Sequence, residues 1–141
     1  MKDIVFAMLV VGGLYGSYNF FIKMASGGIH QILGAVILQV VAAIVGGAIL
    51  IMLRLNGQTF TATTSSVLWA VIAGIAVGLA EIASFYVFSR GLNSTIGIPL
   101  IIGGTVIVGF LLGWIFLKEP ISLTQIGGLG LLLAGIWLVS K

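Results

Sequence analysis

One carboxylate lies inside a run of residues that is otherwise apolar enough to cross a membrane. The residue is Glu81, and the run extends from Trp69 to Arg90. With the middle of the run near Gly78, Glu81 lies about 4–5 Å from the bilayer centre, at about 1.5 Å of rise per residue. A bare charge at that depth costs roughly 2.5–3.5 kcal/mol, so we expect Glu81 to face protein or water. Glu81 is therefore the first candidate functional group.

The depth of Glu81 supports two interpretations. In the first, Glu81 binds either a proton or a cationic substrate, and each displaces the other. A lone acid can do this because no intramembrane Lys or Arg neutralises it. In the second, it is a structural acid that hydrogen-bonds another helix in its neutral form. The other two acids, Asp3 and Glu119, lie where apolar runs begin or end. Intramembrane acids are functional by default, which favours the first interpretation.

The helix face that carries Glu81 also carries small and aromatic residues. By helical spacing these are Gly74, Gly78, Ser84, Phe85 and Phe88. Glycines on this face allow a neighbouring helix or a ligand to approach closely. Ser84 and Phe85 are therefore candidate binding residues beside Glu81.

The first apolar run supplies a second group of candidates. Positions 12, 15, 16, 19 and 23 recur at spacings of three and four, so their side chains form one stripe that we expect to face protein. Aromatic faces attract organic cations, so aromatic and amide groups can line a binding pocket. The candidates for such a pocket are Tyr15, Tyr18, Asn19, Phe85 and Trp114. The alternative is ordinary helix packing, which we favour for the tryptophans, Trp69, Trp114 and Trp137.

Three further residues interrupt apolar runs. Pro99 removes a backbone hydrogen bond and can create a hinge, although proline is tolerated in the first turns of a helix. Gln39 and Thr105 either line a cavity or hydrogen-bond between helices, and we favour the second.

The composition excludes several classes of protein. The chain of 141 residues is 60% hydrophobic and 6% charged, with a mean hydropathy of +1.31, so we expect an integral membrane protein. It contains no cysteine, and His30 is the only histidine, so we expect no metal site and no cofactor. No second deep acid, His or Lys can form a catalytic pair with Glu81, so we do not expect an enzyme. The six cations form no basic patch, so we expect no nucleic-acid binding.

The apolar runs predict a single domain, residues 1–141, of five transmembrane helices. The runs cover residues 1–23, 29–53, 69–90, 95–117 and 122–141. The first run resembles a signal peptide, but its aromatic and polar second half favours a retained helix. The breaks between runs are Ser26-Gly27-Gly28, a polar loop of residues 55–66, Gly91-Leu92-Asn93-Ser94 and Lys118-Glu119-Pro120.

The cations are balanced between the two sides of the membrane. Five spans place Lys2, Arg54 and Lys118 on one side. They place Lys23, Arg90 and Lys141 on the other. Orientation follows an excess of Lys and Arg in cytoplasmic loops, and here the excess is zero, so the chain can insert both ways. Two copies inserted in opposite orientations would then form an antiparallel homodimer. The alternative is that the amino group of Met1 or a partner protein fixes one orientation.

The end of the chain carries a motif that resembles a known family. The segment Leu117-Lys118-Glu119-Pro120, followed by Gln125-Ile126-Gly127-Gly128 and Ala134-Gly135, resembles the end of an EamA-type repeat of the drug/metabolite transporter superfamily. Within the first run, the segment from Gly16 to Lys23 is similar to the start of that repeat. Residues 85–99 are similar to the end of its third helix and the entry to its fourth. The resemblance covers essentially all five runs.

The resemblance implies a dimeric transporter. Most members of the superfamily carry two five-helix repeats, and this chain supplies one, which implies a homodimer, most simply antiparallel, with a cavity lined by the first four helices of each protomer. Small multidrug resistance proteins are related antiparallel dimers, but their essential glutamate lies in the first helix, whereas here the acid is in the third. Their mechanism is therefore not transferred residue by residue.

We thus expect a secondary active transporter in a prokaryotic inner or plasma membrane, which it crosses several times. Its partners would be the lipid bilayer, protons and a small exported solute, metabolite or organic cation. The alternatives are an uncoupled facilitator and a half-transporter or accessory subunit that needs a non-identical partner.

Overall fold

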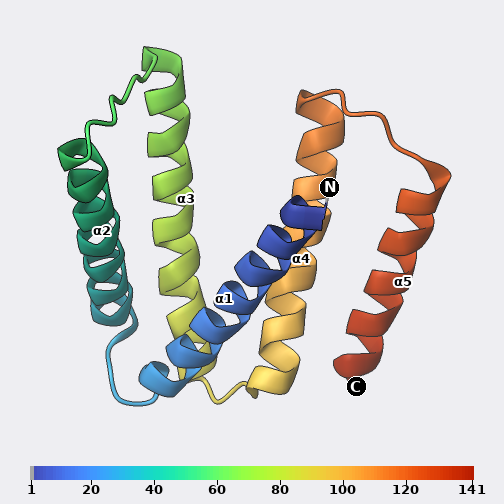
Figure 1. Cartoon of the computed structure of the whole chain (residues 1–141). Helices are drawn as coiled ribbons and strands as arrows, with labels where there is room; N and C mark the ends of the chain where they lie inside the picture. Colours follow the sequence, from blue (N-terminus) through green and yellow to red (C-terminus); the bar gives the residue numbers. More distant parts are fainter. Residues whose placement is uncertain (1) are drawn as a thin grey trace. The chain divides into compact units, whose positions relative to one another are not determined.

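The computed structural model describes residues 2–141 and consists of five α-helices in this part of the chain (Figure 1). Met1, whose amino group is one of the predicted determinants of orientation, lies outside the described residues. The helices are α1 (Lys2–Ser26), α2 (Gln31–Leu55), α3 (Thr64–Ser89), α4 (Ser94–Phe116) and α5 (Leu123–Val139). The all-helical fold expected from the apolar runs is therefore confirmed.

Local sequence signals determine where the helices begin and end. The Thr63 side chain caps α3 by accepting a hydrogen bond from the Ser66 backbone N–H at 3.2 Å. Ser122 and Gln125 form a reciprocal capping box at the start of α5. The turn between α3 and α4 contains Gly91 at φ +91°, a conformation that L side chains rarely adopt.

The polar connection between α2 and α3 is shorter than the sequence predicts. The expected loop covers residues 55–66, but α2 continues to Leu55 and α3 begins at Thr64. The prediction was wrong at its C-terminal end because the cap at Thr63 satisfies a backbone donor of the first turn, which lets polar residues 64–66 enter the helix.

Four helices are long and apolar enough to cross a membrane. Helices α1, α2, α3 and α4 contain 25, 25, 26 and 23 residues. Helix α5 contains 17 residues, which corresponds to roughly 25 Å and lies at the lower limit for a hydrocarbon core of about 30 Å. The fifth span therefore stays a prediction.

The chain divides into two compact units. One comprises residues 21–91, in which α2 and α3 pack against each other as an antiparallel pair. The other comprises residues 2–20 and 92–141, in which α4 packs against α5. The apolar side chains that are buried within the described residues are Ile22, Ala35, Phe85 and Phe88, all in the first of these units. Most of the apolar surface is thus available to lipid or to another chain.

Candidate functional site

Two close contacts establish how α2 and α3 face each other. A β-carbon built on Gly34 of α2 would lie 2.5 Å from Cε1 of Phe85 in α3, so the aromatic ring fills the space that Gly34 leaves open. A β-carbon built on Gly78 of α3 would lie 3.5 Å from the amide nitrogen Nε2 of Gln39 in α2. Since these pairs run in opposite directions along the two helices, they define an antiparallel register.

Glu81 lies between these two contacts. Positions 78, 81 and 85 follow one another at spacings of three and four, so Glu81 shares the side of α3 that faces α2. Only 6% of Glu81 is exposed. Its oxygen Oε2 is buried without a hydrogen-bond partner among the described residues. A buried polar atom without a partner is uncommon in folded proteins and requires an explanation.

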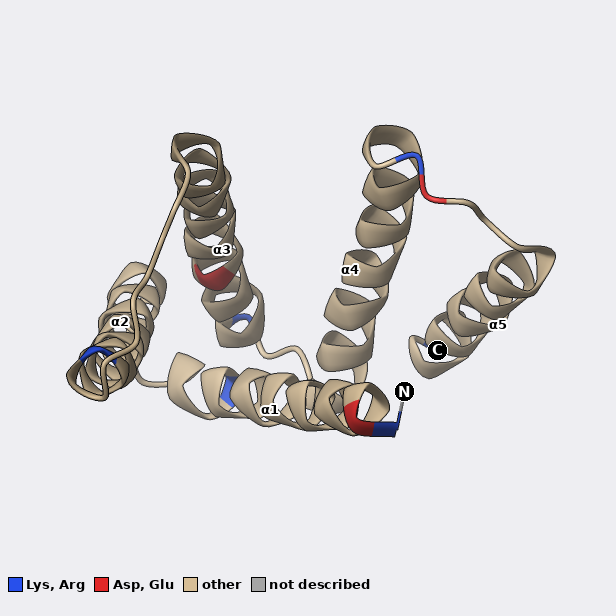
Figure 2. Cartoon of the chain, turned by 45° about the horizontal axis from the view of Figure 1, so that its top comes forward, with Lys and Arg blue, Asp and Glu red and all other residues tan. Residues whose placement is uncertain are grey.

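The nearest elements bring no opposite charge into contact with Glu81. In α2 the only charged residue is Arg54, in the last turn. From the end of α1, the ammonium of Lys23 donates a hydrogen bond to the Phe88 carbonyl oxygen at 3.2 Å and lies 5.9 Å from the centre of the Phe88 ring. Lys23 therefore stabilises the C-terminal end of α3, where free carbonyl groups favour a cation. Figure 2 shows the same pattern, because Lys and Arg lie near helix ends while an acid lies within the ribbon of α3.

The predicted binding residues Ser84 and Phe85 lie on the same helix as Glu81. Phe85 is 3% exposed and packs against Gly34, so its main contact is with α2. Ser84 is half-buried, and its hydroxyl makes no side-chain hydrogen bond within the part of the chain that the structure describes. Phe85 is thus a packing residue of the site, and Ser84 contributes a free hydroxyl.

The candidate residues of α1 differ in burial, because Asn19 is buried, Tyr18 is half-buried and Tyr15 is exposed. Asn19 is 5% exposed, and its Nδ2 donates a hydrogen bond to the Tyr15 carbonyl oxygen at 2.8 Å. Tyr15 is 61% exposed and makes an edge-to-face contact with Tyr18, with ring centres 6.0 Å apart. The predicted protein-facing stripe is therefore not continuous in this single chain, because a side chain at Gly12 would also meet open space.

The remaining candidates differ in what surrounds them. Helix α4 runs without a break through Pro99, which leaves the Thr95 carbonyl without its usual partner; a hinge there stays a prediction. Thr105 donates to the carbonyl oxygen of Ile101 in its own helix at 3.0 Å, so the interhelical bond expected for it was wrong. Trp114 is 54% exposed, which does not place it in a pocket of this chain.

Gln39 also departs from expectation. Its amide reaches α3 beside Gly78 but makes no hydrogen bond among the described residues, so the interhelical bond expected for it was wrong too. The reason is that glycine offers no side-chain partner at the point where the amide meets α3. Sequence reasoning missed Gly34 altogether, although a glycine early in an otherwise bulky apolar run is a signal of close packing.

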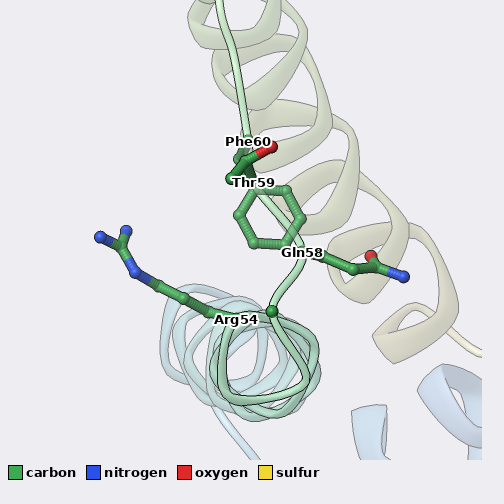
Figure 3. A pocket seen from close by; sticks show the side chains of 5 residues that line it. Arg54, Gln58, Thr59 and Phe60 are labelled. Atoms are coloured by element: carbon green, nitrogen blue, oxygen red, sulfur yellow. The ribbon is translucent and has the colours of Figure 1, made fainter.

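A separate hollow lies at the connection between α2 and α3. Arg54, Gly57, Gln58, Thr59 and Phe60 line it (Figure 3). All five are exposed, and Figure 3 shows the Arg54 side chain extending away from Gln58 and Phe60. Thr64, the first residue of α3, is 17 residues before Glu81, or roughly 25 Å along the helix, so the hollow is distinct from the Glu81 site.

Together these features define an all-α, multi-pass membrane protein with a buried acid between two packed helices. Comparison with protein-family models finds no match to the chain, and comparisons with curated proteins and with solved structures find none.

Proposed function

We propose that this chain is one protomer of a secondary active transporter that exports a small organic cation or metabolite in exchange for protons. The observation that carries the proposal is Glu81, a deeply placed acid that is 6% exposed and has an oxygen without a partner. Structural acids in membranes are paired with another polar group, so an unpaired acid favours a role with an exchangeable partner. The membrane concerned is the inner or plasma membrane of a prokaryote.

The exchange follows from the competition of two cations for one carboxylate. A proton on Glu81 neutralises the carboxyl and makes the site acceptable in a medium of low polarity. A cationic substrate neutralises it equally well, so its binding releases the proton, and protonation releases the substrate. No covalent chemistry is needed. The Lys23 ammonium is bonded to the Phe88 carbonyl oxygen at the end of α3, and Arg54 lies in the last turn of α2, away from Glu81.

Alternating access requires a second half, which we propose is an antiparallel copy of the same chain. One observation supports this assembly, which is the large exposed apolar surface of the helices. Two predictions from the sequence agree with it: the equal division of cations if all five helices cross the membrane, and the resemblance to a single EamA-type repeat. In such a dimer the first four helices of each protomer line the cavity, and α5 serves packing or dimer contacts. Tyr15, Tyr18 and Asn19 are the candidates for the cavity surface of α1.

Transport by reconstituted protein tests the role of Glu81. We expect proteoliposomes that are acidic inside to take up radiolabelled 1,4-diaminobutane faster than empty liposomes, and Glu81→Gln to reduce this uptake to the empty-liposome level. The matched control is Glu119→Gln, which removes an acid at a helix connection and should leave uptake within about twofold of the unmodified protein. Uptake by Glu81→Gln that equals uptake by the unmodified protein would refute the proposal.

A further inference from the structure

Arg90, which follows the last residue of α3, is an exposed cation that contacts an aromatic ring. Its guanidinium lies 4.9 Å from the centre of the Tyr86 ring, and Tyr86 is itself 45% exposed. Arg90 makes no ion pair with an acid among the described residues. The contact with Tyr86 therefore holds the guanidinium at the surface, where its N–H donors are available to another molecule.

Glu119, which follows the end of α4, is an exposed acid beside backbone carbonyl groups. The N–H groups of Leu117 and Glu119 donate to the Gly113 carbonyl oxygen at 3.2 and 3.3 Å. Lys118 has a φ of 56°, a left-handed conformation, so the chain turns back sharply at this point. The Glu119 carboxylate then lies against the helix, because a β-carbon built on Gly113 would be 2.9 Å from its Oε2.

The position of Glu119 favours a positively charged partner. The C-terminal end of a helix carries partial negative charge, which repels a carboxylate and attracts a cation. Glu119 makes no ion pair among the described residues. A cation from another molecule would neutralise both the carboxylate and the end of α4.

Arg90 and Glu119 are separated by one helix that is long enough to cross a membrane. Helix α4 has 23 residues, which corresponds to roughly 35 Å, so its crossing places the two side chains at opposite membrane surfaces. A second copy in the same orientation would place Arg90 at the surface of the other Arg90, where like charges repel. An inverted copy would place its Glu119 at that surface instead.

We propose that an inverted second copy docks on this chain through two ion pairs, each between the Arg90 guanidinium of one copy and the Glu119 carboxylate of the other. Two-fold symmetry repeats the pair at both membrane surfaces. Arginine can bind both oxygens of a carboxylate, which fixes the orientation of the contact. The exposed apolar side chains of α4 supply surface for the copies to cover between the two pairs. This inference rests on the proposed function, because it identifies the contact that favours the inverted copy.

Cross-linking of two differently tagged full chains tests whether the residues meet. One chain carries Arg90→Cys and the other Glu119→Cys, so their dimer retains the reciprocal pair at its other surface. The chains are mixed in mild detergent, where no membrane fixes their orientation, and treated with a short bismaleimide. The chain has no cysteine of its own, so we expect one product that carries both tags. Thr59→Cys, at the opposite end of α3 from Arg90, replaces Arg90→Cys in the control and should give less than about a tenth of that product.

Charge reversal measures how much the pairs contribute to dimerisation. We expect Arg90→Glu or Glu119→Arg alone to weaken dimerisation in detergent about tenfold, because each variant brings like charges together at both surfaces. The double variant should return to within about threefold of the unmodified chain. Energy transfer between fluorescently labelled chains gives the dissociation constants. Arg54→Glu, which reverses a cation at the end of α2, is the control and should change dimerisation by less than about twofold.

Neutralisation of Glu119 is a milder change than reversal of its charge. Glu119→Gln removes an attraction without adding a repulsion, and an exposed ion pair contributes only a few-fold to an association. The Glu119→Gln variant therefore retains the dimer that transport requires.

The outcomes separate the ion pairs from the transport proposal. A product with both tags, together with recovery in the double variant, supports the contact. Absence of that product, an equal yield with Thr59→Cys, or additive effects of the two reversals overturns it, as would occur if Arg90 binds a lipid phosphate instead. A dimer that forms through other contacts, with uptake that still depends on Glu81, leaves the proposed function intact. A chain that is monomeric in detergent and in proteoliposomes contradicts both proposals.

Discussion

Gly34 of α2 lies directly against the aromatic ring of Phe85 in α3, with 2.5 Å between a β-carbon at position 34 and Cε1 of the ring. Phe85 is 3% exposed, so its ring has little freedom to move away. This contact allows the two helix backbones to approach closely on the side that contains Glu81. The position of the acid therefore depends on the absence of a side chain at Gly34.

Replacement of Gly34 by alanine should loosen the α2–α3 pair. We expect Gly34→Ala to lower the free energy of unfolding by about 1–3 kcal/mol, the usual cost of inserting a methyl group into a packed contact. Unfolding of the purified protein by denaturing detergent, followed by circular dichroism, measures the change. Gly46→Ala is the matched control, because Gly46 lies in the same helix and faces open space. Equal stabilities of the two variants would show that the Phe85 contact does not limit packing.

A similar contact joins α4 to α5. A β-carbon at Gly103 would overlap Cδ1 of Ile136, so Gly103→Ala should destabilise the packing of these two helices. Since Ile136→Val removes the overlapping methyl group, the double variant should recover most of the lost stability, which a double-mutant cycle on thermal unfolding can measure. Gly104→Ala, at a neighbouring position with open space, serves as the control. Additive effects of the two substitutions would contradict the contact.

The bond between Lys23 and the Phe88 carbonyl should protect the end of α3. The Phe88 carbonyl oxygen also accepts a hydrogen bond from the Gly91 N–H at 3.2 Å. We expect Lys23→Met, which retains much of the apolar stem and removes the ammonium, to accelerate amide hydrogen exchange around Gly91 several-fold, because the helix end loses a stabilising cation. Lys141→Met should leave exchange there unchanged. Unaltered exchange in Lys23→Met would mean that the bond contributes nothing to the stability of this end.

The sequence predicted the helices well because length and hydropathy alone distinguish membrane-spanning runs. The face of α3 that carries Gly78, Glu81 and Phe85 was also predictable, since helical spacing is a local property. The contacts across that face were not, because they depend on the register between α2 and α3. For this reason Gly34 was overlooked and Gln39 was assigned a hydrogen bond that it does not make.

The proposed architecture requires the chain to adopt both orientations in the membrane. Helix α3, which has 26 residues, separates Thr59 in the α2–α3 connection from Asn93 in the α3–α4 connection, so the two positions report opposite sides whether or not α5 crosses. Both residues are exposed, and the Asn93 side chain makes no cap bond, so Thr59→Cys and Asn93→Cys are mild changes that leave every charge in place.

Labelling of these single cysteines in intact cells with a membrane-impermeant maleimide is the most direct test. The chain has no cysteine of its own, so each signal comes from one position. An antiparallel homodimer predicts that about half of the molecules are labelled at each site, with complete labelling at both after the cells are lysed. Full labelling at one site and full protection at the other would contradict the inverted homodimer and would require a different chain for the second half.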